Sequence, residues 1–147
     1  MATRIKMDQI ESNGYKAILG LEKFIESTPL TGTHKDLIKI RASQINGCAF
    51  CIDMHTKEAR KAGETEQRIY ALNAWRDTPF FTKEERAILA LTEEVTLISN
   101  HVKDETYTAA ENILGETYLA QVILAIITIN AWNRIGITTL LVPAQYQ

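Results

Sequence analysis

The sequence is poor in several residue types, and each shortage excludes a class of protein. Of its 147 residues only 2 are cysteine, 3 are histidine and 3 are proline. Two cysteines are too few for a disulfide-stapled secreted scaffold, and the prolines all fall between segments of helical periodicity. With 16 basic and 18 acidic residues the net charge is −2, so the basic excess of a nucleic-acid-binding protein is missing.

Long apolar runs are also missing. The most apolar stretch, residues 118–141, is interrupted by Gln121, Asn130, Asn133 and Arg134, and it falls short of the roughly 18 consecutive apolar residues of a membrane span. We interpret it as a buried helix. The first residues, MATRIKMDQIESNGYKAILG, lack the apolar core and cleavage site of a signal peptide. We therefore expect a cytoplasmic protein that binds neither membranes nor nucleic acid.

What is present is helical periodicity throughout, with no linker or low-complexity tract. We predict a single all-α domain over residues 1–147, with about seven helices and no strands. Asn46-Gly47 indicates a helix stop and a tight turn, and Thr82 with Glu85 indicates a capping box. The expected helices cover residues 15–27, 33–44 (capped by Thr33), 48–63, 65–75 (capped by Thr65), 83–99, 104–114 and 117–135.

The last of these helices is apolar around most of its circumference. Such a helix must be covered on all sides, and in so short a chain a subunit interface could cover part of it. We therefore expect a homo-oligomer.

Both cysteines and one histidine fall within eight positions, in the stretch INGCAFCIDMH, residues 45–55. In a helix that follows Gly47, the spacing places Cys48, Cys51 and His55 on one face. The first turn of a helix favours a thiolate, and helical side chains lean toward the N-terminus, which tilts His55 toward Cys51. The stretch therefore predicts a reactive dithiol beside a base.

A carboxylate is expected next to this histidine. If the helices on either side of Asn46 form an antiparallel hairpin, Asp36 lies opposite His55. A carboxylate on the far imidazole nitrogen would fix the tautomer and raise the basicity of the ring. We predict that Asp36 and His55 relay protons to the dithiol. Because the base lies beside Cys51, we expect Cys51 to be the nucleophile and Cys48 the resolving thiol.

Two simpler interpretations of these residues are weaker. A zinc site would use the two cysteines and His55 with Asp36 or Asp53, but structural zinc usually recruits a second Cys or His pair, which the sequence lacks. We expect no metal. Two buried, inert cysteines would leave the aligned histidine and facing acid unexplained.

Other side chains have structural interpretations. Glu85 is expected to cap a helix, although Glu85 or Glu93 would line the site if the helix over 83–99 packs over the hairpin. Residues expected in packing or at the surface are Trp75, Trp132, Phe80, Phe81, His34 and His101, and those expected in ion pairs are Arg76 and Arg134.

At this point the sequence resembles a known family. RASQINGCAFCIDMH, with an acid twelve positions before the first cysteine, is similar to the alkyl hydroperoxidase D (AhpD)-like branch of the carboxymuconolactone decarboxylase family. YALNAWRDTPFFTKEERAILALTE and INAWNRIGI extend the resemblance over most of the chain. Two positions depart from it: the acid is usually glutamate, and some members carry a histidine where this chain has Phe50.

The resemblance implies an all-helical fold assembled as trimers or hexamers and a thiol peroxidase activity. It gives Cys51 the attack on the hydroperoxide, Cys48 the closure of a disulfide, and His55 and Asp36 the proton relay. No flavin or nicotinamide fingerprint is present, so we expect no cofactor and regeneration by an external dithiol or thiol. Two alternatives stay open: a lactone decarboxylase or isomerase with His55 as general base, and a non-catalytic redox switch.

Overall fold

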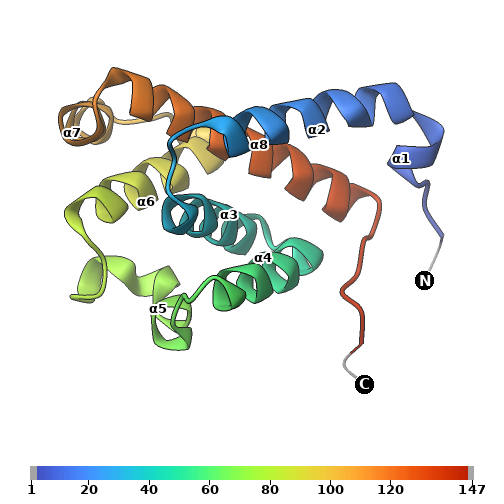
Figure 1. The fold of residues 1–147 in the computed structure, drawn as a ribbon, viewed down its shortest axis with the longest axis horizontal. Helices are drawn as coiled ribbons and strands as arrows, with labels where there is room; N and C mark the ends of the chain where they lie inside the picture. The colour runs from blue at the N-terminus through green and yellow to red at the C-terminus, as the bar shows by residue number, and fades with distance from the viewer. Residues whose placement is uncertain (1–2, 146–147) are drawn as a thin grey trace.

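The protein is helical throughout the part of the chain that the computed structural model describes, residues 3–145 (Figure 1). Within these residues there are eight α-helices, two short 3-10 helices and no strand, which confirms the all-α prediction. The elements in chain order are α1 (Met7–Ile10), α2 (Ser12–Ser27), α3 (Gly32–Asn46), α4 (Ala49–Lys61), α5 (Glu66–Tyr70), η1 (Leu72–Asp77), α6 (Lys83–Thr96), η2 (Ile98–Asn100), α7 (Asp104–Leu114) and α8 (Glu116–Thr138).

The helix ends follow local sequence signals in most places. Thr82 and Glu85 form the predicted capping box at the start of α6, and Thr65 caps α5. Two predictions were wrong in detail. Thr31, not Thr33, caps α3 by accepting a hydrogen bond from the backbone N–H of His34. The helix expected over residues 65–75 is divided at Ala71 into α5 and η1, and η1 is itself kinked at Ala74, with φ −122° and ψ 27°.

Helix α3 lies between two hydrophobic clusters, so it is the helix from which the others are positioned. Its residues Ile38 and Ala42 face the larger cluster, formed with α2, α6, α7 and α8. Leu37 and Ile40 face a smaller cluster formed with α4, η1 and α6. Because both of its faces are buried, α3 fixes the place of α4, which follows it after a tight turn.

Helix α8 has a length and mean hydropathy that would allow it to cross a membrane. In the structure it runs through the middle of the fold (Figure 1) and packs against α2, α3, α4, α6 and α7. Its buried residues include the polar side chains of Thr128 and Asn133. Packing by five helices agrees with the interpretation as a buried helix, although Ile127 and Ile137 on α8 are exposed.

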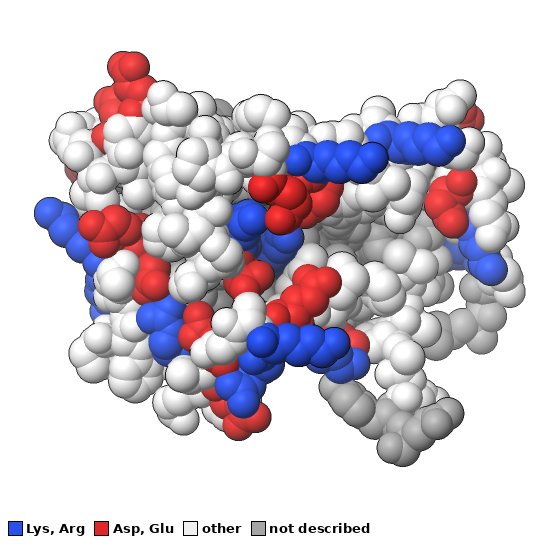
Figure 2. Space-filling model, in the orientation of Figure 1, with Lys and Arg blue, Asp and Glu red and all other residues white. Residues whose placement is uncertain are grey.

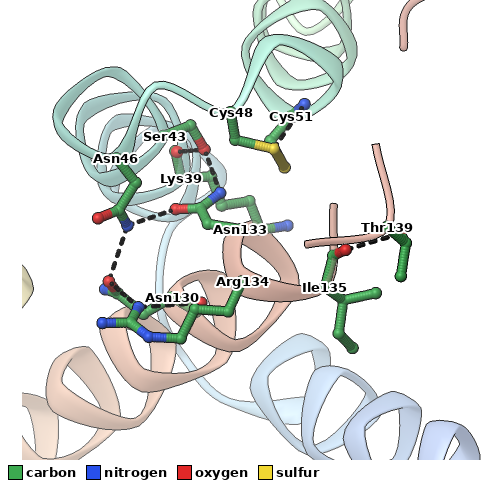
Figure 3. Close-up of a disulfide and its surroundings, with 10 residues drawn as sticks. All are labelled: Lys39, Ser43, Asn46, Cys48, Cys51, Asn130, Asn133, Arg134, Ile135 and Thr139. Atoms are coloured by element: carbon green, nitrogen blue, oxygen red, sulfur yellow. Dashed lines mark hydrogen bonds between the residues drawn. A yellow bond between two sulfur atoms is a disulfide. The ribbon is translucent and has the colours of Figure 1, made fainter. Parts of the chain in front are cut away.

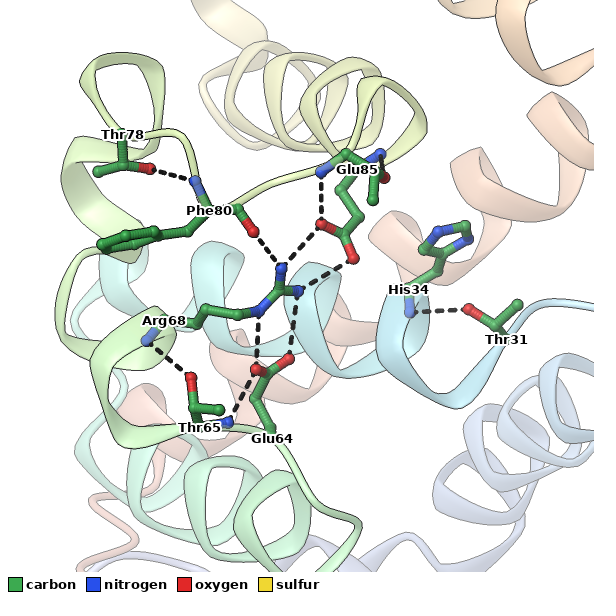
Figure 4. Close-up of polar contacts among 9 residues, drawn as sticks. Thr31, His34, Glu64, Thr65, Arg68, Thr78, Phe80 and Glu85 are labelled. Atoms are coloured by element: carbon green, nitrogen blue, oxygen red, sulfur yellow. Dashed lines mark hydrogen bonds and ion pairs between the residues drawn. The ribbon is translucent and has the colours of Figure 1, made fainter.

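Two charged clusters tie the chain between α4 and α6 to the rest of the fold. Arg68 on α5 lies between Glu64 and Glu85 (Figure 4), at 2.8 Å from Glu64 Oε1 and 3.0 Å from Glu85 Oε1, and also donates to the Phe80 carbonyl oxygen. Its guanidinium stacks 4.7 Å from the centre of the Phe81 ring. These contacts of Arg68 fix the loop before α6.

The second cluster is centred on Glu93 of α6. Its carboxylate accepts hydrogen bonds from Arg41 Nε at 3.0 Å, Trp75 Nε1 at 2.9 Å and Arg76 Nη1 at 2.6 Å, which link α3, η1 and α6. Burial alone would raise the pKa of Glu93, but these three hydrogen bonds outweigh it and hold the pKa below its ordinary value. Arg76 is therefore in an ion pair, as expected, and Glu93 is its partner.

Candidate active site

The turn between α3 and α4 places the cysteine pair. Gly47 adopts the left-handed conformation, with φ 71° and ψ 35°, that ends many helices. The backbone N–H of Cys48 then donates to the carbonyl oxygen of Ser43 at 3.0 Å, closing the turn. Cys48 becomes the N-cap of α4, and the N–H of Cys51 points at its sulfur, 3.4 Å away. The predicted helix stop is confirmed, and the cysteine pair begins a helix as expected.

Cys48 and Cys51 are joined by a disulfide, with their Cα atoms 5.3 Å apart. Both are buried, and α8 passes close behind them at Gly136. A β-carbon on Gly136 would be 3.1 Å from Cys48 Sγ and 3.7 Å from Cys51 Sγ. Only glycine leaves the disulfide this much room against the helix.

A buried amide network connects the same turn to α8 (Figure 3). Asn133, fully buried, donates to Ser43 Oγ at 3.0 Å, and its oxygen accepts from Asn46 Nδ2 at 2.9 Å. The Asn46 amide also donates to Asn130 Oδ1 at 2.9 Å. Buried polar groups are stable only when they are hydrogen-bonded, and this network satisfies them while fixing the end of α3 beside the cysteines.

A pocket of about 390 Å³ opens in front of Cys51. Figure 2 shows the surface hollowed between α2 along the top and α4 below it. Cys51 and His55 line this pocket and Cys48 does not, so one sulfur of the pair faces it. The remaining lining residues are Tyr15, Leu19, Glu22, Lys39, Phe50, Met54, Glu58, Trp132, Ile135, Gly136 and Leu141.

His55 is buried on α4, and its Nδ1 lies 3.0 Å from Glu58 Oε2. Burial lowers the pKa of His55 below its ordinary value of 6.5, and the hydrogen bond to Glu58 opposes this only in part. The ring is therefore neutral at pH 7. With Nδ1–H donating to the carboxylate, the lone pair is on Nε2, which makes the histidine a base toward its other side.

The direct bond predicted between Asp36 and His55 was wrong. Among the described residues Glu58 is the carboxylate bonded to this imidazole, and Asp36 does not line the pocket. Glu58 is one helical turn from His55 on the same face of α4, which brings its carboxylate within reach of the ring. Asp36 is half-buried on α3. Burial raises its pKa, and the carboxylates of Glu58 and Glu64 add to this effect against Lys39.

Several residues of this site were not predicted from the sequence. The three-residue spacing from His55 to Glu58 was available as a signal, because it places both side chains on one face of α4. Gly136, Asn133 and Trp132 had no such signal, since they come from α8, more than 75 residues further along the chain. Trp132 was expected only in packing, and it also lines the pocket.

The remaining candidates lie elsewhere. Glu85 and Glu93 do not line the pocket. His34, expected at the surface, is half-buried and bonds the Tyr118 hydroxyl at 2.6 Å, whereas His101 is exposed. Arg134 binds Asn130 rather than an acid. Within residues 3–145 no three His, Cys, Asp or Glu side chains are grouped as a metal ion would need.

The fold and the pocket define a class: an all-helical protein with a cysteine pair at the start of a helix, one sulfur of which faces a pocket that it shares with a histidine. The family profile described as the carboxymuconolactone decarboxylase family matches residues 14–94, more than half of the chain. The protein belongs to the carboxymuconolactone decarboxylase family, and its fold is AhpD-like.

Three similar proteins show how far the likeness extends. The uncharacterized protein YdfG of Bacillus subtilis is 47% identical over 93% of this chain and 94% of its own. ATU0492 of Agrobacterium tumefaciens, a protein of unknown function named as a candidate antioxidant defence protein AhpD, is 36% identical with a TM-score of 0.92 over 98% of this chain and 100% of its own. The debrominase Bmp8 shares the fold, with a TM-score of 0.78 at 20% identity over 87% of this chain and 70% of its own.

Proposed function

We propose that the protein is a thiol peroxidase that reduces organic hydroperoxides through Cys51 and Cys48. The observation that carries this proposal is that the Cys51 sulfur and the neutral His55 face one pocket, while Cys48 is bonded to Cys51 from behind. Membership in the carboxymuconolactone decarboxylase family supports it, and so does the likeness to ATU0492.

The proposed reaction has two steps in the protein. The Cys51 thiolate attacks a peroxide oxygen, so that an S–O bond forms, the O–O bond breaks, and the leaving alkoxide takes a proton to give the alcohol. Cys51 is thereby oxidised to a sulfenic acid. The Cys48 thiolate then attacks the Cys51 sulfur, a disulfide forms, and the hydroxyl group leaves as water with one proton. An external dithiol or thiol reduces the disulfide by exchange and is itself oxidised.

His55 is the proposed base in this reaction, taking the thiol proton of Cys51 directly or through one water and returning it to the leaving alkoxide. Glu58 orients the ring and stabilises its protonated form. Asp36 remains a proposed member of the proton relay, as a second carboxylate that interacts electrostatically with Glu58. Comparing Asp36→Asn with Glu58→Gln measures which acid the relay uses.

The test is to add cumene hydroperoxide to the reduced protein and count free thiols. The proposal expects two thiols to be lost per chain in the wild type. In Cys51→Ser it expects Cys48 to keep its thiol on the same timescale. No loss in the wild type, or equal loss of Cys48 in the variant, overturns the proposal. A Cys48→Ser/Cys51→Ser variant that turns over a lactone would instead support the decarboxylase or isomerase alternative.

We also propose that the chain forms a homo-oligomer in a reducing compartment such as the cytoplasm. A second, apolar groove of about 630 Å³ between α6, α7 and α8 supports this, because Ile98, Tyr107 and Ile127 stand exposed along it. A trimer or hexamer in light scattering after size exclusion is expected. A change of assembly on oxidation, without peroxide turnover, would favour the redox switch.

A further inference from the structure

We infer that the pocket in front of Cys51 selects neutral hydroperoxides with a compact aromatic or branched apolar group, and that Trp132 is the residue that determines this selection. The inference rests on the proposed function and specifies its substrate. A pocket of about 390 Å³ lies within the range of roughly 300–1,000 Å³ typical of small-molecule sites. It is therefore much larger than hydrogen peroxide needs.

Most residues that line the pocket are apolar, and together they are called the apolar wall here. Tyr15 of α2 and Trp132 of α8 meet edge to face, with ring centres 5.1 Å apart. The other members of the wall are Leu19, Phe50, Met54, Ile135 and Leu141. Leu19, Met54 and Leu141 are exposed, so the wall extends to the mouth of the pocket. Exposed apolar residues concentrated at one pocket indicate a binding surface for an apolar group.

The aromatic part of the wall is held in place by polar contacts. Trp132 Nε1 donates to Glu22 Oε2 at 3.1 Å, and Lys39 Nζ lies 3.2 Å from Glu22 Oε1. The indole is thus held at its Nε1 edge while it lines the pocket. A surface that is ordered before binding loses less entropy when a ligand docks. This makes Trp132 a rigid wall rather than a side chain that adapts to any ligand.

The charged groups of the pocket disfavour anionic substrates. Lys39 pairs with Glu22 and lies 3.8 Å from a second carboxylate, that of Glu26. Glu58 adds a further negative charge beside the neutral His55. The carboxylate of a fatty acid hydroperoxide would therefore meet no uncompensated cation among the described residues that line the pocket, and it would lose hydration on entering.

Leu141, directly after α8, also contributes to this wall. Leu140 has a left-handed φ of 55°, and the N–H of Leu141 returns to donate to the Gly136 carbonyl oxygen at 2.9 Å. The chain therefore turns directly after α8 and holds Leu141 beside Gly136, the glycine next to the disulfide. The apolar wall and Cys51 line the same pocket, so a group bound on the wall lies near the reacting atom.

The experiment compares three peroxides in single turnover with the reduced protein, with free thiols counted over time. Cumene hydroperoxide is the neutral aromatic probe, linoleic acid hydroperoxide the anionic probe and hydrogen peroxide the small one. We expect the second-order rate constant for cumene hydroperoxide to exceed that for hydrogen peroxide by about 100-fold, the discrimination that apolar contacts of this size give. In Trp132→Leu the ratio should fall about tenfold, and Trp132→Phe should restore part of it.

Two further variants keep the inference testable if Trp132→Leu folds poorly. Leu19→Lys at the exposed rim adds a cation and should raise the rate with linoleic acid hydroperoxide several-fold relative to cumene hydroperoxide. Tyr70→Leu, which removes an exposed aromatic ring far from the pocket on α5, is the matched control and should leave all ratios as in the wild type. Equal rates for all three peroxides, or ratios unmoved in folded Trp132 and Leu19 variants, would overturn the inference and leave the peroxidase standing. Loss of no thiols with any peroxide would overturn the proposed function itself.

Discussion

Gly136 and Cys48 are in such close contact that a β-carbon on the glycine would lie 3.1 Å from the cysteine sulfur. The two residues are 88 positions apart, one in the last helix and the other at the turn before α4. Together with the amide network of Asn133, this contact makes α8 the back wall of the cysteine pair. Several expected outcomes depend on this arrangement.

Gly136→Ala should destabilise the oxidised protein, because the added methyl group presses on Cys48 Sγ and neither α8 nor the turn can move freely. Overpacking of this kind costs about 1–3 kcal/mol. The measurement is urea unfolding of the oxidised protein. Gly20→Ala in α2 is the matched control, since nothing lies within 4 Å of its added β-carbon. Alanine should stabilise that helix by roughly 0.5–1 kcal/mol. Equal effects at both glycines would contradict the close contact.

Asn133→Ala should lower the free energy of unfolding by about 1–3 kcal/mol, because it removes the donor to the Ser43 hydroxyl and one of the two acceptors of the Asn46 amide. The same change should make Cys48 more accessible to a thiol reagent in the reduced protein, since the turn loses its tie to α8. Asn112→Ala on the exposed face of α7 is the control and should change neither quantity. If Asn133→Ala changes neither the free energy of unfolding nor the accessibility of Cys48, the network does not hold the turn.

The rate of Cys51 oxidation should fall on acidification as His55 takes up a proton. Burial places the pKa of this histidine below 6.5, so the fall should occur below that pH. Because the hydrogen bond to Glu58 favours the protonated ring, Glu58→Gln should lower the pKa of His55 and move the fall to still lower pH. It should also reduce the plateau rate by about three- to tenfold. Glu105→Gln, an exposed change on α7, is the control for overall charge.

The same pH profile distinguishes the two acids. If Glu58 orients the ring, Asp36→Asn should shift the profile less than Glu58→Gln does. Since the pKa of Asp36 is raised in the folded protein, its ionisation opposes folding at neutral pH, and this cost vanishes below its unfolded value of 3.8. Asp36→Asn should accordingly stabilise the protein at pH 7 and not at pH 3. If Asp36→Asn instead shifts the profile more than Glu58→Gln does, Asp36 is the acid of the relay.

Glu93→Gln should destabilise the fold at pH 7 by about 1–3 kcal/mol, because Arg41 and Arg76 lose a charged acceptor. The folded pKa of Glu93 lies below its ordinary 4.5, so its contribution is present above pH 4.5 and is lost as the pH falls through the folded value. Urea unfolding at pH 7 and pH 3 checks both statements: the difference between variant and wild type should shrink at the lower pH.

Local features of the fold could be predicted from the sequence. Helical spacing, the capping box at Thr82 and the Asn46-Gly47 stop each depend on residues within one or two turns. The same is true of the stripe formed by Cys48, Cys51 and His55. Glu58 belongs to this local class too, because it lies three residues after His55 on the same face of α4.

Features that depend on packing between distant segments could not be predicted in the same way. The position of Asp36 relative to His55 follows from the rotation of α3 about its axis, which both hydrophobic clusters determine. The contact of Gly136 with Cys48 and the wall at Trp132 need the register of α8 against α4. No spacing within the sequence encodes that register, since it results from the packing of whole helices.

The most direct test of the account is made on the Cys48→Ser variant, reduced and then mixed with one equivalent of cumene hydroperoxide. Without its resolving partner, Cys51 should accumulate as a sulfenic acid, seen by mass spectrometry as one added oxygen on the peptide that contains it and by trapping with dimedone. One equivalent of cumyl alcohol should appear with it. A Cys51 that stays a free thiol in the folded variant, or oxygen found only on methionine, would contradict the central claim that this sulfur reduces hydroperoxides.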